Sequence, residues 1–181
     1  MNMPKYIGLL LALVVTFAAG KAKAVNLIGN QLFYTGGNLH IENLPADSGF
    51  DNYMYLRTPL DGDKFLFIDN GDQQVTFTQG ELLSFGVDVG DELLFMMLPD
   101  NTTPAFFTGP ADRNPDNLIH AQIFSLGDGW FRVGFEDLLG GGDADFNDAQ
   151  FNVPEPSTLT LLALGLIGFR LRRFSGAKNS H

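Results

Sequence analysis

Short apolar stretches, separated by turn-forming residues, run through the middle of the chain from residue 25 to residue 153. Many are rich in aromatic and β-branched residues, and Gly, Asn, Asp or Pro bound them, which is the pattern of short strands. One segment, 80–85, has the composition of a short helix. The predicted strands are 31–34, 39–42, 53–57, 64–68, 74–78, 93–98, 105–108, 118–125, 130–135 and 149–153.

So many short strands at this spacing predict an all-β domain, either a β-sandwich or a jelly roll. The Asn70-Gly71 pair predicts a hairpin between 64–68 and 74–78. Composition agrees, because the 181 residues include 17 Phe, 21 Gly and 9 Pro. The chain has no cysteine, so the fold must rest on its core or on a bound ion.

Charge is distributed unevenly along the chain. Residues 25–153 hold 20 Asp and Glu against 4 Lys and Arg, a net −16, while the whole chain carries −10. Phosphate backbones repel such a domain, which excludes nucleic acid as a partner. The acidic surface either attracts cations or is simply well solvated.

The first 24 residues have the order of a secretory signal peptide. Lys5 supplies the positive region, residues 7–19 are apolar, and small residues lead to a cleavage site between Ala24 and Val25. The alternative is a buried or anchoring N-terminal helix.

Residues 154–181 have the order of a membrane-inserted tail. Pro154 and Pro156 end the last strand, residues 157–169 are almost wholly apolar, and Arg170, Arg172 and Arg173 follow. A helix from Pro156 to the arginines is about 21 Å long, short of the roughly 30 Å hydrocarbon core. We expect a single transmembrane helix with the arginines on the cytoplasmic side; a plain tail anchor is the alternative.

The order Pro154-Glu155-Pro156, apolar helix and arginine cluster resembles the PEP-CTERM sorting signal of exported proteins in Gram-negative bacteria that make extracellular polysaccharide. The resemblance implies removal of the helix near the Pro-Glu-Pro triplet by an exosortase-type membrane protease. It therefore implies a transient inner-membrane stage before release to the cell surface or extracellular (biofilm) matrix.

Candidate chemistry concentrates in residues 136–148, where acidic side chains surround a triple glycine. Asp143, Asp145 and Asn147 follow the i, i+2, i+4 spacing of the first half of a calcium loop. The glycines allow Glu136 and Asp137 to fold back toward them. An EF-hand is excluded because its sixth position is Asp148 instead of glycine. A solvated acidic turn is the alternative.

The sequence FEDLLGGGDADFNDAQF resembles the C-terminal signature of a bacterial extracellular domain family of unassigned function. The resemblance implies a β-rich secreted module, suspected of binding calcium, and brings no activity with it. The candidate calcium ligands that it implies are Glu136, Asp137, Asp143, Asp145, Asn147 and Asp148.

No catalytic motif stands out elsewhere. Asp47-Ser48-Gly49 resembles one half of an aspartic protease site, but there is no second copy. We therefore expect a non-enzymatic, calcium-stabilised structural or adhesive module. The alternatives are a carbohydrate-binding module, for which Trp130, Tyr53 and Tyr55 offer stacking rings, and a small polysaccharide hydrolase.

Overall fold

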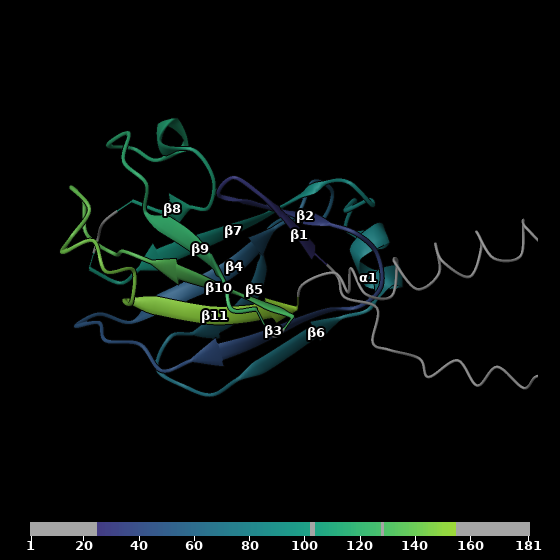
Figure 1. The fold of residues 1–181 in the computed structure, drawn as a ribbon, viewed down its shortest axis with the longest axis horizontal. Coiled ribbons are helices and arrows are strands. Elements are labelled where there is room, and N and C mark those ends of the chain that lie inside the picture. The colour runs from purple at the N-terminus through teal and green to yellow at the C-terminus, as the bar shows by residue number, and fades with distance from the viewer. Residues whose placement is uncertain (1–24, 102–103, 128, 155–181) are drawn as a thin grey trace, which may run out of the picture.

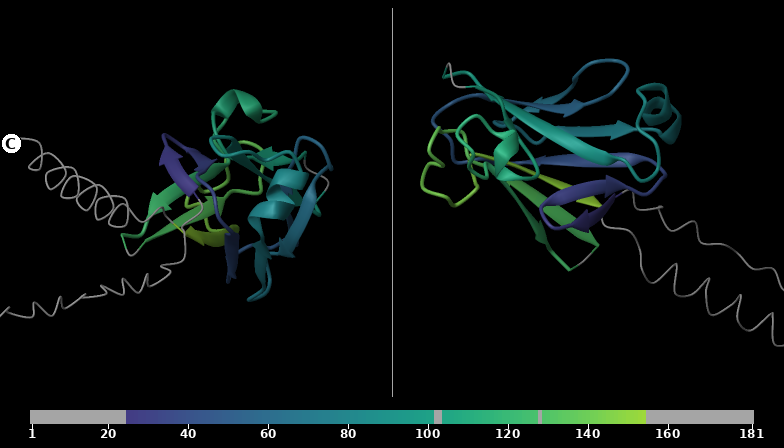
Figure 2. Two further views of the ribbon diagram at one scale, coloured as in Figure 1. Left: turned by 90° about the vertical axis from the view of Figure 1, so that its right-hand side faces the viewer. Right: turned by 90° about the horizontal axis from the view of Figure 1, so that it is seen from above.

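A computed structural model describes residues 25–101, 104–127 and 129–154 of the chain. The expected all-β class is confirmed, because these residues form two antiparallel sheets with one short α-helix, α1 (Gln79–Ser84), and one 3-10 turn, η1 (Ala111–Arg113). The two sheets form separate layers (Figures 1 and 2). Within the described residues, no helix combines the length and the apolar character needed to cross a membrane. The expected helix over 157–169 and the signal peptide 1–24 lie outside the described residues.

Sheet I has six strands, all antiparallel, and the short strand β8 pairs with β7 beside its main path. In spatial order it consists of β1 (Val25–Ile28), β2 (Gln31–Tyr34), β7 (Glu92–Pro99), β4 (Asn52–Arg57) and β5 (Lys64–Ile68), with β8 (Phe106–Phe107).

Sheet II has five antiparallel strands and joins segments from both ends of the domain. In spatial order it consists of β6 (Gln74–Phe77), β3 (Leu39–Leu44), β11 (Ala149–Pro154), β10 (Trp130–Phe135) and β9 (Ala121–Ser125).

The core lies between the sheets and is largely aromatic. Phe151 of β11 meets Phe95 of β7 across the layers, with ring centroids 4.8 Å apart, and Phe67 of β5 at 5.8 Å. These rings are buried because β11 alternates strictly between buried and half-buried positions. Period-two alternation therefore fixes which side of each sheet-II strand faces the core.

The predicted hairpin at Asn70-Gly71 is wrong. β5 belongs to sheet I and β6 to sheet II, so the turn crosses between the layers. The buried amide of Asn43 explains the crossing, because its Nδ2 atom donates to the carbonyls of Ile68, at 3.1 Å, and Gly71, at 2.6 Å. A tertiary contact thus overrides the local turn signal.

Apart from shifts of one or two residues at strand ends, the strands differ from the prediction in two places. The strand expected over 118–125 begins at Ala121, because Asn117 takes a left-handed φ of 59° and Asn114 Nδ2 donates to the Leu118 carbonyl at 2.8 Å. An additional strand, β1, covers Val25–Ile28 and pairs with β2.

Candidate metal centre

The acidic loop, residues 136–148, joins β10 to β11 and lies at the opposite end of the sheets from α1 (Figure 1). Its base is closed by the pairing of Phe135 with Ala149 and by a 3.1 Å bond from the Asp148 N–H to the Phe135 carbonyl. On the outer side, the Glu136 N–H donates to the His120 carbonyl at 2.9 Å. The first residue of the loop is therefore held in the sheet.

The backbone of the loop is left-handed at five positions. Gly140, Gly141 and Gly142 have φ angles of 88°, 82° and 52°, and Ala144 and Phe146 have 60° and 56°. Glycine enters this region freely, but each non-glycine residue costs about 1–2 kcal/mol there. A specific contact holds Phe146 in place, since its N–H donates to Glu136 Oε1. The loop curls so that its tip returns to its first residue.

This curl brings three of the expected ligands together. One carboxylate oxygen each from Glu136, Asp143 and Asp145 lie within 4.8 Å of one another. Glu136 is buried, whereas Asp143 and Asp145 are exposed. In the described part of the chain, the ion pairs of lysine and arginine are with Asp63, Asp61 and Glu92, outside the acidic loop.

Glu136 presents an unsatisfied oxygen to this cluster. The residue is 1% exposed, and its Oε2 atom has no hydrogen-bond partner among the described residues. Burial raises the pKa of Glu136, the charges of Asp143 and Asp145 reinforce that shift, and the N–H groups of Phe146 and Ala144 oppose it. A buried acceptor without a partner is costly, so this oxygen suits a proton, a water molecule or a cation.

The geometry suits a hard divalent cation. Calcium binds oxygen ligands at about 2.3–2.6 Å, so two oxygens on one ion are at most about 5 Å apart. The three carboxylates satisfy this limit. Calcium takes six to eight ligands, so backbone carbonyls and water would complete the shell.

The other expected ligands take different positions. Asn147 supports Asp145, because its Nδ2 atom donates to Asp145 Oδ2 at 2.5 Å. Asp137 is buried and turned toward sheet I, where its Oδ2 accepts from Ser48 Oγ at 2.5 Å and from Asn52 Nδ2 at 3.1 Å. Asp137 therefore belongs to a separate buried polar cluster.

That cluster also contains Asp148, the last expected ligand, and Asp69. Asn52 is fully buried and donates from Nδ2 to Asp69 Oδ2 at 2.7 Å. The pKa of Asp148 is raised to about 7, and burial is the largest cause. The negative charges of Asp137 and Glu136 raise this pKa further, whereas the hydrogen bond from the Asp137 N–H lowers it. Burial likewise raises the pKa of Asp69. The acids crowd together at the end of the core nearest the acidic loop.

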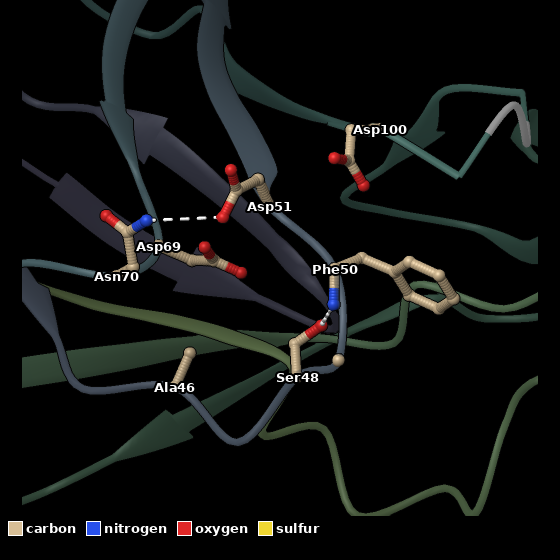
Figure 3. A pocket seen from close by; sticks show the side chains of 8 residues that line it. Ala46, Ser48, Phe50, Asp51, Asp69, Asn70 and Asp100 are labelled. Atoms are coloured by element: carbon tan, nitrogen blue, oxygen red, sulfur yellow. Dashed lines mark hydrogen bonds between the residues drawn. The ribbon is translucent and has the colours of Figure 1, made fainter.

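Sequence reasoning did not identify Asn52 or Asp69 as site residues. Both are polar residues at the end of an apolar strand, which is also the pattern of an ordinary turn. Asp69 borders an open hollow of about 400 Å³ together with Ser48, Asp51 and Asp100, as Figure 3 shows. The sequence carries no signal that these side chains meet.

His120 fastens the acidic loop from the other side. Its fully buried ring places Nδ1 3.0 Å from the Glu136 carbonyl and Nε2 2.9 Å from Asp116 Oδ2. The Gly140 N–H also donates to Asp116 Oδ2, at 2.8 Å. Burial alone would raise the pKa of Asp116, but these donors and Leu118 lower it to about 2. Both ring nitrogens of His120 thus face oxygen atoms, which fixes the orientation of the ring against the loop.

Comparison with known protein families finds one domain family that covers much of this two-sheet domain and one sorting motif at its end. The chain belongs to the family described as Domain of unknown function (DUF4114), whose model matches residues 61–155, just over half of the chain. The PEP-CTERM protein-sorting motif matches residues 152–173, which marks an exported protein that an exosortase processes. No curated protein and no solved structure matched the chain.

Proposed function

We propose that this chain is a non-enzymatic structural or adhesive module of an exopolysaccharide matrix, and that calcium at Glu136, Asp143 and Asp145 stabilises its β-domain. One observation carries the calcium site: Glu136 Oε2 is buried, lacks a hydrogen-bond partner among the described residues and lies close to two further carboxylates. Three carboxylates at this separation repel one another unless a cation neutralises them.

The position of the site suggests what the ion does. Glu136 is fixed at the end of β10, whereas Asp143 and Asp145 lie at the exposed tip of the loop. An ion shared by the three closes the loop onto the sheet and constrains the neighbouring β10–β11 pair. Calcium is thus a structural ligand in this proposal, and its binding energy adds to folding stability.

Export from the cytoplasm would bring the protein to a compartment where calcium is available as a structural ligand. A protein that carries the PEP-CTERM motif leaves the cytoplasm, and extracellular calcium modules work at about 0.1–1 mM affinity. The motif begins in the last strand, and its Pro154 pairs with Trp130 at the far end of β10 from the acidic loop. The attachment point and the candidate site therefore lie about 17 Å apart along the strand, so membrane attachment before processing leaves the site free.

Thermal unfolding of the full-length protein tests the calcium site. At about 10 mM calcium and an affinity of about 0.1–1 mM, we expect about 1.4–2.7 kcal/mol of stabilisation and a Tm rise of roughly 5–10 °C, reversed by EDTA. Asp143→Asn combined with Asp145→Asn should abolish the rise. Asp72→Asn, at an exposed position outside the loop, is the matched control and should retain it. Equal melting in calcium and in EDTA would refute the site.

Mass spectrometry tests the sorting step separately. In cells with an intact processing system, we expect the mature C-terminus near Pro154-Glu155-Pro156, without the arginine cluster. A chain still ending at His181 would contradict exosortase cleavage, whatever the result for calcium.

A further inference from the structure

The outer surface of sheet I carries a continuous apolar and aromatic band. Tyr55 of β4 pairs directly with Phe65 of β5 on one side and with Met96 of β7 on the other, and Met96 pairs with Phe107 of β8. Tyr53 pairs with Leu98 one step further along. We call this surface the aromatic face, formed by Tyr53, Tyr55, Phe65, Met96, Leu98 and Phe107.

These side chains do not belong to the core. Their strand neighbours Met54, Phe95 and Met97 are buried between the sheets, so the aromatic face points outward. Phe65 is 53% exposed, and Leu98 is 40% exposed. The strand β7 is apolar on both sides, a pattern typical of a strand covered on both faces.

The outward side of sheet II is different. It presents polar side chains, namely His40 and Glu42 of β3, Arg132 of β10, and Gln150 and Asn152 of β11. Trp130 lies there too, edge-on to the His40 ring at 6.3 Å. An ordinary solvated sheet face looks like sheet II, so the apolar character of sheet I calls for a ligand.

A hollow of about 420 Å³ adjoins the aromatic face where β4 ends and β7 begins. Arg57 and Leu94, direct partners in the two strands, line it together with Glu92. The Arg57 guanidinium also lies 5.5 Å from the Phe107 ring centroid. Arg57 thus connects the apolar rings to a hollow with a few hydrogen-bonding groups, a combination found in many small-ligand sites.

Charge around this surface selects the kind of ligand. Three ion pairs surround it, Arg57 with Asp63, Lys64 with Asp61 and Arg113 with Glu92, at 3.0, 2.5 and 2.7 Å. These pairs neutralise three of the acidic side chains here and leave Asp91 of the hollow, whereas residues 25–153 as a whole carry −16. An acidic polymer or a second copy of this chain would be repelled by that net charge. The surface suits a neutral ligand.

We propose that the aromatic face and the adjoining hollow bind a neutral polysaccharide. The apolar C–H faces of its sugar rings would stack on Tyr55, Phe65 and Phe107, while its hydroxyl groups would exchange hydrogen bonds with Arg57 and Glu92. Aromatic rings arrayed along neighbouring strands suit an extended chain of sugars. This inference rests on sheet I alone and is independent of the calcium site.

Affinity electrophoresis of the full-length protein in a mild detergent, through gels containing dextran, mannan or a mixed-linkage β-glucan, tests the proposal, with alginate as the acidic comparison. We expect at least one neutral polymer to retard the protein. Phe65→Ala should weaken that binding by about tenfold. Phe124→Ala, which removes a ring 39% exposed on β9 of sheet II, should leave it unchanged.

Because Phe65 is largely exposed, its loss should not unfold the domain, and equal melting temperatures would verify this. Three results would overturn the proposal: no retardation by any neutral polymer, retardation by alginate alone, or self-association in sedimentation that Phe65→Ala abolishes. The last would assign the face to a second copy. Calcium-dependent melting without sugar binding would refute this inference and leave the calcium site standing.

Discussion

The carboxylate of Glu136 occupies the space that a side chain on Gly142 would fill. A Cβ atom at position 142 would collide with Glu136 Oε2, and the Glu136 side chain is held at its other oxygen by the Phe146 N–H. The triple glycine therefore does more than turn the chain: its last member lets a buried carboxylate reach the loop tip.

The first prediction separates this contact from backbone strain. Gly142→Ala should remove the calcium-induced rise in Tm, because the new methyl group displaces Glu136 Oε2 from the candidate site. Gly140→Ala is the matched control: Gly140 also has a left-handed φ, 88°, but no other described residue beyond its chain neighbours lies within 4 Å of its Cβ position.

Both variants should lose about 1–2 kcal/mol in EDTA from the left-handed conformation. The control should retain the calcium response. Differential scanning calorimetry with and without calcium measures both effects, and an unchanged calcium response in Gly142→Ala would contradict the role of Glu136.

The second prediction concerns pH. A carboxyl whose pKa is raised by folding binds its proton more tightly in the folded state, so stability falls as pH rises from the ordinary to the raised pKa. For Asp148 that window runs from its ordinary value of 3.8 to about 7. In EDTA, the free energy of unfolding should therefore decrease between about pH 5 and about pH 8, as urea titrations would show.

Asp148→Asn is the discriminating variant, since an amide imitates the protonated acid and does not titrate. It should match the parent protein at about pH 5, exceed its stability at about pH 8 and flatten the slope. A slope as steep as that of the parent would assign the titration to other groups. Calcium should bind more tightly as pH rises, because it requires Glu136 to ionise.

Local patterns predicted most of the fold. Strands 31–34, 64–68 and 130–135 have the expected bounds, since apolar runs ended by turn residues specify them without tertiary information. The turn at Asn70-Gly71 does not form the hairpin that its sequence predicts, because the buried amide of Asn43 on β3 binds the backbone of this turn and directs the chain to sheet II. Pairing between distant strands is set by contacts that a linear pattern does not contain.

For the candidate site, the sequence predicted the loop but not the arrangement of its side chains. Spacing identified a loop with many oxygen ligands, but it could not divide six side chains between two clusters. That division depends on Asn52 and Ser48, which are more than 80 residues away in sequence and hold Asp137. The outward direction of Tyr53 and Tyr55 likewise became evident only from strand register.

The third prediction concerns the free edge of sheet II. Asn30, in the turn between β1 and β2, donates from Nδ2 to the Ala121 carbonyl at 2.5 Å and accepts from the Ile123 N–H at 3.1 Å. It thereby covers backbone groups of the edge strand β9, which otherwise invite pairing with another chain.

Asn30→Ala should cost about 1–3 kcal/mol of stability and promote aggregation on heating, because two backbone groups lose their partner. Asn26→Ala, at an exposed position on β1, is the control. Urea unfolding and light scattering provide the two readouts. Equal stability and equal scattering for both variants would show that water molecules satisfy the backbone groups of β9 as well as the Asn30 side chain does.

The fourth prediction tests the link between His120 and the acidic loop. Asp116→Asn removes the negative partner of a fully buried, doubly hydrogen-bonded imidazole, and breaking a buried pair from one side costs about 3–5 kcal/mol. Because the Asp116 side chain is 17% exposed, we expect a smaller loss, about 2–3 kcal/mol. The loss should appear in urea unfolding at neutral pH and shrink toward about pH 2, where Asp116 itself takes up a proton.

The control variant is Asp112→Asn, at an exposed position on η1, which should change stability by less than about 0.5 kcal/mol. If the two variants unfold alike, His120 is held by the Glu136 carbonyl alone, and Asp116 plays no part in fastening the loop.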